Sequence, residues 1–367
     1  MIDVSETRAV AEMRRLIESQ RKAAEAARQL AGIRDRDVDL AATPKTEVFR
    51  IGDKVLYRCH GTGAPADGPP VLAIYALVGS YKVLDLQPDR SFVGNLLEAG
   101  LDVYVVDWGH PNRACRHDDL GDYIEGYLDA FVDAVRKASG HDKINLLGLC
   151  QGGVLSLCHA ALFPEKIRNL ILLVTPVDFH ADKEEDHPGR GFMNVWARNL
   201  EAEDIDLMVE TLGIIPGEIG GLAFTIMTPF RSLAKYNLTL TEVGQDKAKL
   251  MNFLRMEKWL ADRPAHAGAA ARQWLNDLYR ENALFRGTFE VDGRPVDLKQ
   301  VTMPVLNIYT ETDHIIPPAM TRGLGALIGS GDHTDYVARG GHIGVMVAGG
   351  SARAALRDRI SGWLATR

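Results

Sequence analysis

Hydrophobic residues in the central and C-terminal parts of the chain form short runs that are apolar on both faces. Five such runs, rich in β-branched side chains, cover residues 71–78, 102–108, 144–148, 170–174 and 304–309. Strands that are buried on both faces of a parallel sheet have this pattern. Helical spacing appears between the runs, over residues 90–99, 120–138 and 152–162. The alternation of strand and helix predicts an α/β fold with a mostly parallel sheet.

The N-terminal segment has a different pattern. Residues 5–31 are rich in Ala, Arg, Glu and Gln, and they carry apolar residues at helical spacing, namely Val10, Met13, Leu16 and Ile17. This spacing predicts an amphipathic helix, which either packs on the body of the protein or docks a partner. Residues 43–60 then alternate as strands do, and residues 61–70 (GTGAPADGPP) form a loop.

The strand–helix alternation stops at residue 178 and resumes at Val301. The sequence between them is helical and irregular, with bulky apolar groups such as Trp196, Trp259 and Trp274. An insertion into a single sheet explains this most economically. We therefore expect an N-terminal helical segment (1–42), a core (43–177 and 301–367) and a helical cap (178–300).

Composition and charge disfavour several classes of protein. The 367 residues are 46% hydrophobic and 25% charged, with a net charge of −7. These are ordinary values for a globular enzyme. A nucleic-acid binder is disfavoured, because neutralising phosphates requires a basic patch. No apolar stretch approaches the roughly 18 residues of a membrane span, and the N-terminus lacks the apolar region of a signal peptide.

The cysteines indicate a reducing compartment. The chain has four of them, Cys59, Cys115, Cys150 and Cys158, with no CxxC pair. This is too few and too scattered for a disulfide framework, so we expect a cytoplasmic protein with reduced thiols.

A nucleophile motif follows the third of the five apolar runs. Residues 148–152 read GLCQG and lead directly into a helical pattern. This is the strand–turn–helix elbow of G-x-nucleophile-x-G type, with Cys150 where serine is usual. Glycines flank the nucleophile because a Cβ would clash in so tight a turn, and the helix N-terminus favours the thiolate. The alternative is a buried structural cysteine at a tight turn.

Such an elbow requires an acid and a base later in the chain, in that order. Asp313 follows the apolar run 304–309, and His342 follows the extended run 334–337. Both positions lie just past a late strand, at the sheet edge where α/β proteins bind ligands. His314 and His333 are weaker candidates for the base.

Two backbone N–H groups are expected to form an oxyanion hole. Gln151, directly after the nucleophile, should supply one of them. The loop after residues 71–78 should supply the other, from Val78 or Gly79.

A cysteine at this position favours one kind of chemistry. A thiol that attacks a thioester forms another thioester, so the acyl group stays activated. A serine would form a more stable oxoester. Acyl transfer from a thioester donor is therefore a better hypothesis than simple hydrolysis.

From about Val71 to the C-terminus, the chain resembles the poly(3-hydroxyalkanoate) synthases. The resemblance is carried by YALV (75–78), LDLQPDRS (84–91), VDWG (106–109), the cysteine elbow, DHIIP (313–317) and GHI (341–343). It implies an α/β-hydrolase fold with an inserted cap. It also implies that Cys150 is the acylated nucleophile, with Asp313 and His342 as its partners. The substrate it implies is hydroxyacyl-coenzyme A, with no further cofactor and no metal.

The length and Gln151 resemble the short two-component enzymes called class III, more than class IV. That resemblance implies a homodimer, a second helical subunit and association with polymer granules. One departure lies at residues 79–82, where GSYK replaces the family's usual Asn-Arg/Lys-Pro type of segment next to the expected oxyanion loop.

Two other functions fit the residues less well. A cysteine-nucleophile hydrolase, such as an intracellular depolymerase or a dienelactone-type hydrolase, would release free hydroxy acid instead of coenzyme A and polymer. A granule-coating scaffold protein would not need the complete Cys, Asp and His set.

Overall fold

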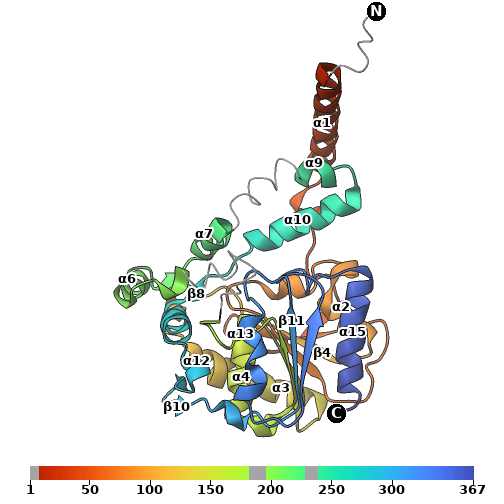
Figure 1. Cartoon of the computed structure of the whole chain (residues 1–367). Helices are drawn as coiled ribbons and strands as arrows, with labels where there is room; N and C mark the ends of the chain where they lie inside the picture. Colours follow the sequence, from red (N-terminus) through yellow and green to blue (C-terminus); the bar gives the residue numbers. More distant parts are fainter. Residues whose placement is uncertain (1–7, 182–195, 228–238) are drawn as a thin grey trace, which may run out of the picture.

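The computed structural model describes residues 8–181, 196–227 and 239–367 (Figure 1). Residues 5–7 of the expected N-terminal helix, and residues 182–195 and 228–238 of the expected cap, lie outside the described residues. The centre of the molecule is an eight-stranded sheet with the order β1-β2-β4-β3-β5-β6-β11-β12. Strands β1 and β2 pair antiparallel, as do β2 and β4, and the other pairs are parallel. The prediction of a mostly parallel sheet is confirmed.

The strands of this sheet lie close to the positions predicted by the apolar runs, the alternating segment 43–60 and the extended run 334–337. Their bounds are β1 (Lys45–Ile51), β2 (Lys54–Cys59), β3 (Val71–Ile74), β4 (Val103–Asp107), β5 (Ile144–Leu149), β6 (Ile167–Leu173), β11 (Val305–Thr310) and β12 (His333–Ala338).

Helices cover both faces of the sheet, so its central strands are apolar on both sides. Consecutive residues of β5 show this, because Leu146 belongs to one buried cluster and Leu147 to the other. The first cluster includes side chains of α3 (Asp129–Ser139) and α4 (Gln151–Leu162). The second includes side chains of α2 (Phe92–Glu98) and α15 (Gly350–Leu364). Figure 1 shows these two helices side by side.

One strand is shorter than predicted, and one helix is of a different type. Strand β3 ends at Ile74, so residues 75–78 belong to the following loop and not to the strand. The helix expected over 120–138 is a π-helix, Asp122–Leu128, that continues into α3. An apolar period of 3.6 residues does not separate a π-turn from an α-turn over so short a stretch.

Helix α1 (Arg8–Ala31) extends away from the sheet and is packed near its C-terminal end against α9 (Leu240–Val243) (Figure 1). Gln245, just past α9, donates a hydrogen bond from Nε2 to the carbonyl oxygen of Lys22 at 2.8 Å. Closer to the N-terminus of α1, the side chains of Met13, Leu16 and Ile17 are exposed. The predicted amphipathic helix is present, and the apolar side chains in this part of it face solvent.

The described part of the expected cap is mostly helical. It contains α6 (Ala202–Leu212), α7 (Gly217–Met227), α9, α10 (Lys247–Ala261), α11 (Gly268–Gln273), a π-helix (Trp274–Arg280) and α12 (Ala283–Arg286), with the strand pairs β7 (Ile214–Ile215)–β8 (His266–Ala267) and β9 (Glu290–Val291)–β10 (Arg294–Pro295). Buried residues from Ala267 to Leu298 share the core cluster of α4. The proposed boundaries of the cap stay a prediction.

Two short helices, α13 (Ala319–Arg322) and α14 (Leu324–Leu327), lie between β11 and β12. Single 3-10 turns complete the chain at Asp35–Asp37, Tyr81–Leu84, Pro88–Arg90, Arg113–Cys115, Pro164–Lys166 and Leu298–Gln300. Across the described ranges, we find no helix with the length and apolar character needed to cross a membrane.

Candidate active site

Cys150 lies in the turn that joins β5 to α4. Its backbone has φ 53° and ψ −121°, and its N–H donates to the carbonyl oxygen of Leu173 at 2.9 Å. A positive φ at a residue with a Cβ is strained, and such strain is typical of a nucleophile elbow. The thiol is half-buried and sits at the N-terminus of a 12-residue helix.

The glycines of the elbow are required by close contacts with neighbouring segments of the chain. A Cβ at Gly152 would lie 2.3 Å from the carbonyl oxygen of Ile74, and a Cβ at Gly153 would lie 1.9 Å from Oγ1 of Thr175. Atoms cannot approach so closely without a shift of the backbone or of Thr175. The elbow is therefore packed directly against the end of β3 and against the segment that follows β6.

Asp313 and His342 meet beside the sheet, although they come from separate loops. Asp313 follows β11 and His342 follows β12. Oδ2 of Asp313 accepts a hydrogen bond from Nδ1 of His342 at 2.7 Å, and both side chains are buried. Oδ1 accepts the backbone N–H groups of Ile315 and Ile316, each at 2.9 Å. The carboxylate is thus held on both oxygens.

The electrostatic surroundings favour a charged imidazole. Burial by itself lowers the pKa of His342, but the negative charges of Asp313 and Cys150 and their hydrogen bonds with the ring outweigh it. The net result is a pKa well above the ordinary value of 6.5. His342 therefore interacts with both other members of the predicted set.

The two competing histidines are placed differently. His333 is the first residue of β12 and pairs with Val305 at the start of β11, so it lies at the end of the sheet away from the elbow. His314 is half-buried next to Asp313. The carboxylate of Asp313 bonds to His342, so the geometry favours His342 as the base.

The expected oxyanion loop follows β3 and touches the elbow. The N–H of Leu77 donates to Oε1 of Gln151 at 2.9 Å, and both residues are buried. The N–H of Leu77 is therefore already bonded, and the assignment of Val78 or Gly79 as the second donor stays a prediction. Gln151 is the first residue of α4, where a backbone N–H has no partner inside the helix.

The same loop is crowded around Tyr75. Burial raises the pKa of Tyr75, and the negative charge of Cys150 raises it further, so the phenol stays neutral close to the thiol. A Cβ at Gly79 would lie 3.0 Å from Cε1 of Tyr75. Gly79, the first residue of the GSYK segment, therefore leaves room for the ring of Tyr75.

Sequence reasoning missed two residues that hold this loop. His266 Nε2 lies 3.1 Å from Nε2 of Gln151, and Trp259 donates from Nε1 to the carbonyl oxygen of Ser80 at 2.8 Å. Both come from the expected cap, and the sequence pattern identifies Trp259 only as a bulky apolar group. His266 lies on a strand of two residues, which is too short to give a periodic signal.

Two of the other cysteines are unsuited to nucleophilic attack. Burial raises the pKa of Cys59 and of Cys158 to about 12, with the charge of Asp85 contributing at Cys59. Those thiols stay protonated at neutral pH, and a protonated thiol is a poor nucleophile.

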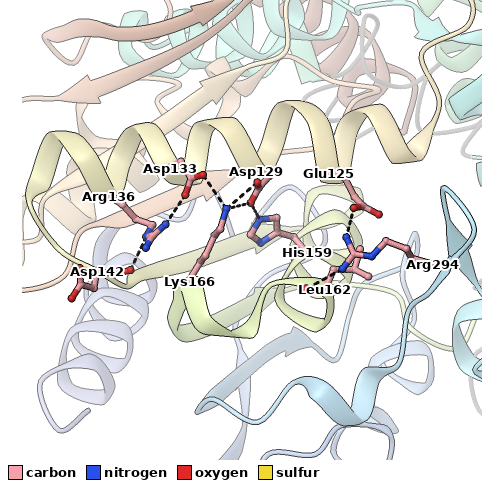
Figure 2. A network of polar contacts seen from close by, with 9 residues as sticks. All are labelled: Glu125, Asp129, Asp133, Arg136, Asp142, His159, Leu162, Lys166 and Arg294. Carbon is pink, nitrogen blue, oxygen red and sulfur yellow. Dashed lines mark hydrogen bonds and ion pairs between the residues drawn. The ribbon is translucent and has the colours of Figure 1, made fainter.

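A second histidine–aspartate pair lies elsewhere, between α3 and α4 (Figure 2). Nε2 of His159 is 3.0 Å from Oδ1 of Asp129, and Lys166 bonds to both oxygens of Asp129 at 2.7 and 2.9 Å and to Asp133. His159 is eight residues into α4, about 12 Å along the helix from its start. Burial lowers its pKa, and its partners form an ion network, so this pair ties α4 to α3.

The fold, together with the arrangement of Cys150, Asp313 and His342, can be compared with known protein families. The sequence profile of the alpha/beta hydrolase fold family matches residues 69–348. Solved structures of similar shape include an alpha/beta hydrolase fold protein from Chitinophaga pinensis, with a TM-score of 0.49, 14% identity and coverage of 89% of this chain and 99% of that one. A thermophilic esterase from Thermogutta terrifontis has a TM-score of 0.48, 18% identity and coverage of 88% and 98%. The profile match confirms the prediction of an α/β-hydrolase fold.

Proteins of similar sequence identify the family within this fold class. A protein named poly(3-hydroxyalkanoate) polymerase subunit PhaC from Allochromatium vinosum is 43% identical, over 90% of both chains. Proteins of the same name from Synechocystis and Thiocystis violacea are 42% identical (92% of this chain, 88% of that one) and 39% identical (90% of both). The chain belongs to the poly(3-hydroxyalkanoate) polymerase family, and the prediction of an acyltransferase of this family is confirmed.

Proposed function

We propose that this protein polymerises 3-hydroxyacyl groups from coenzyme A thioesters into polyhydroxyalkanoate, through a covalent acyl group on Cys150. In this proposal His342 is the base and Asp313 orients it. The observation that carries it is the buried Asp313–His342 pair at 2.7 Å, interacting with a thiol at a strained elbow.

The first step is acylation. The thiolate of Cys150 attacks the thioester carbonyl, and the protonated His342 gives its proton to the departing coenzyme A sulfur. One carbon–sulfur bond forms and another breaks, so the step is close to thermoneutral. The N–H groups of Gln151 and Val78 bind the oxyanion that develops on the carbonyl oxygen.

The second step forms the ester. The hydroxyl of another hydroxyacyl unit, or of the growing chain, attacks the acyl group on Cys150. His342 accepts the hydroxyl proton and returns it to the sulfur as the carbon–sulfur bond breaks. The product is a longer ester, and the free thiol is regenerated. An apolar cap would exclude water, which would otherwise hydrolyse the acyl-enzyme.

The test is to follow isotope-labelled 3-hydroxybutyryl-coenzyme A. The proposal expects release of coenzyme A, precipitation of polymer and a label on Cys150 that Cys150→Ala abolishes. Free hydroxy acid in place of polymer would identify a hydrolase. A label on Cys59, Cys115 or Cys158 would refute the assignment of the nucleophile, and no turnover with any thioester would favour a scaffold role.

We also propose that the chain works as a homodimer with a second helical subunit at the surface of polymer granules. Two observations support a partner. The relatives at 39–43% identity are themselves named as subunits, and α1 exposes Met13, Leu16 and Ile17 to solvent.

A further inference from the structure

The polar contacts around Gln151 form a chain that leads from the expected cap to the oxyanion loop. The side-chain oxygen of Gln151 accepts the N–H of Leu77, so its nitrogen must be the atom that faces His266. That nitrogen can only donate a hydrogen bond, and Nε2 of His266 is therefore the acceptor.

The other ring nitrogen fixes the tautomer. Nδ1 of His266 lies 3.1 Å from the carbonyl oxygen of Ala267, which can only accept. The proton consequently resides on Nδ1, and Nε2 is unprotonated. Burial lowers the pKa of His266 to about 4, so the ring keeps this neutral form throughout the neutral range.

The backbone of His266 is also fixed. His266 pairs with Ile215 in the short β7–β8 sheet, and its side chain is only 7% exposed. The next glycine, Gly268, packs so closely that a Cβ there would lie 2.3 Å from the carbonyl oxygen of Gly213. An imidazole held this firmly can hold the amide that it contacts.

Two further contacts join the same pieces of chain. Trp259 bonds to the carbonyl oxygen of Ser80, and Nζ of Lys82 lies 2.6 Å from Oδ2 of Asp262. Residues 259–262 thus contact the C-terminal end of the loop after β3, at Ser80, and the turn that follows it, at Lys82.

From these contacts we infer that His266 is a positioning residue for the oxyanion loop. It holds the side chain of Gln151, which holds the N–H of Leu77 and so aims the N–H of Val78 at the carbonyl being attacked. The inference rests on the proposed function, because it assigns the loop to acylation at Cys150.

The test is the single-turnover rate of acylation of Cys150 by labelled 3-hydroxybutyryl-coenzyme A, measured on the full-length chain. His266→Leu removes the acceptor, and His266→Gln can return an oxygen to nearly the same place. We expect the leucine variant to lose roughly tenfold or more in rate at saturating substrate, with little change in KM, and the glutamine variant to recover most of it. Equal loss in both variants, or a wild-type rate in the leucine variant, would overturn the inference.

A mutant cycle adds a second measurement. Gln151→Met removes the other half of the contact, so the double variant with His266→Leu should be no slower than the slower single variant. Independent, multiplying losses would count against a shared contact. If the His266→Leu variant does not fold, the Gln151→Met variant alone tests the inference. A wild-type acylation rate in the Gln151→Met variant would then overturn it.

A matched control separates positioning from loss of stability. His159 is another buried histidine with a lowered pKa, and it bonds to Asp129 far from the loop. We expect His159→Leu to lower the thermal unfolding midpoint and leave the acylation rate of the folded protein unchanged. Equal slowing in both leucine variants would mean a general effect and would overturn the inference.

The pH profile separates positioning from catalysis. His266→Gln should keep the midpoints of the wild-type profile, because His266 does not titrate in the working range. A moved midpoint would make His266 a proton donor or acceptor and would overturn the positioning role.

The labelling experiment separates failure of this inference from failure of the proposed function. If the wild-type chain places no label on Cys150, the proposed function itself fails. A labelled wild type with an equally fast His266→Leu variant removes only this inference.

Discussion

Nδ1 of His342 donates to Oδ2 of Asp313 at 2.7 Å, although 29 residues and a whole strand separate the two side chains. Because Nδ1 is committed to the carboxylate, Nε2 is the nitrogen that faces Cys150. Two backbone N–H groups hold the other carboxylate oxygen, so the acid cannot rotate without breaking three hydrogen bonds. The orientation of the ring is therefore set by the loop after β11.

Replacing Asp313 by Asn should lower the pKa of His342. Burial lowers that pKa, and the charge of Asp313 is the largest of the groups that raise it, so a neutral amide removes most of the opposing effect. A histidine titration by NMR checks this, with His314→Gln as the control for resonance assignment. We expect the variant still to acylate Cys150 but to elongate poorly, because a thiol ionises partly unaided and a hydroxyl does not. An unchanged His342 pKa would contradict the electrostatic account.

His342→Gln should lose roughly a hundredfold or more in turnover, since it removes the proposed base. His314→Gln should lose less than about tenfold, because the carboxylate of Asp313 is already bonded to His342. Steady-state release of coenzyme A measures both. Equally inactive variants would mean that the base is shared or wrongly assigned.

Gly153→Ala should destabilise the fold by roughly 1–3 kcal/mol, because its Cβ would overlap Oγ1 of Thr175. Gly362 in α15 is the matched control, since a Cβ there meets no described atom within 4 Å. Gly362→Ala should stabilise by about 0.5–1 kcal/mol through the helix alone. Urea unfolding compares the two. A neutral Gly153→Ala would show that the elbow is less tightly packed than its contacts indicate.

Deleting residues 1–30 tests whether α1 docks the proposed second subunit. The isolated full chain should polymerise after a long lag that the partner relieves, since a partner that prefers an open cap shifts the population toward that form. The truncated chain should keep the slow basal rate and lose the stimulation. Full stimulation after truncation would make α1 purely structural, and full activity with no partner would remove the two-subunit proposal.

The sequence predicts those parts of the site that follow strands of six residues. Cys150 and Asp313 come after β5 and β11, which are buried strands of six residues, and an apolar run of that length is recognisable. His342 comes after β12, a partly exposed strand of six residues that the extended run 334–337 predicts. The contact between Gln151 and His266 has no such signal, because 115 residues separate the two side chains. Strand β3 was predicted four residues too long, since residues 75–78 are as apolar as the strand that they follow. Hydrophobicity reports burial, and this loop is mostly buried.

The contact between Gln151 and His266 also sets an order of events at the ribosome. His266 is synthesised 115 residues after Gln151, which takes roughly 6 to 23 s at ordinary elongation rates of about 5–20 residues per second. During that interval the nascent chain already contains the cysteine turn but not the imidazole that holds the neighbouring amide. Cys150 is therefore synthesised well before His266, the residue proposed to hold the loop beside it.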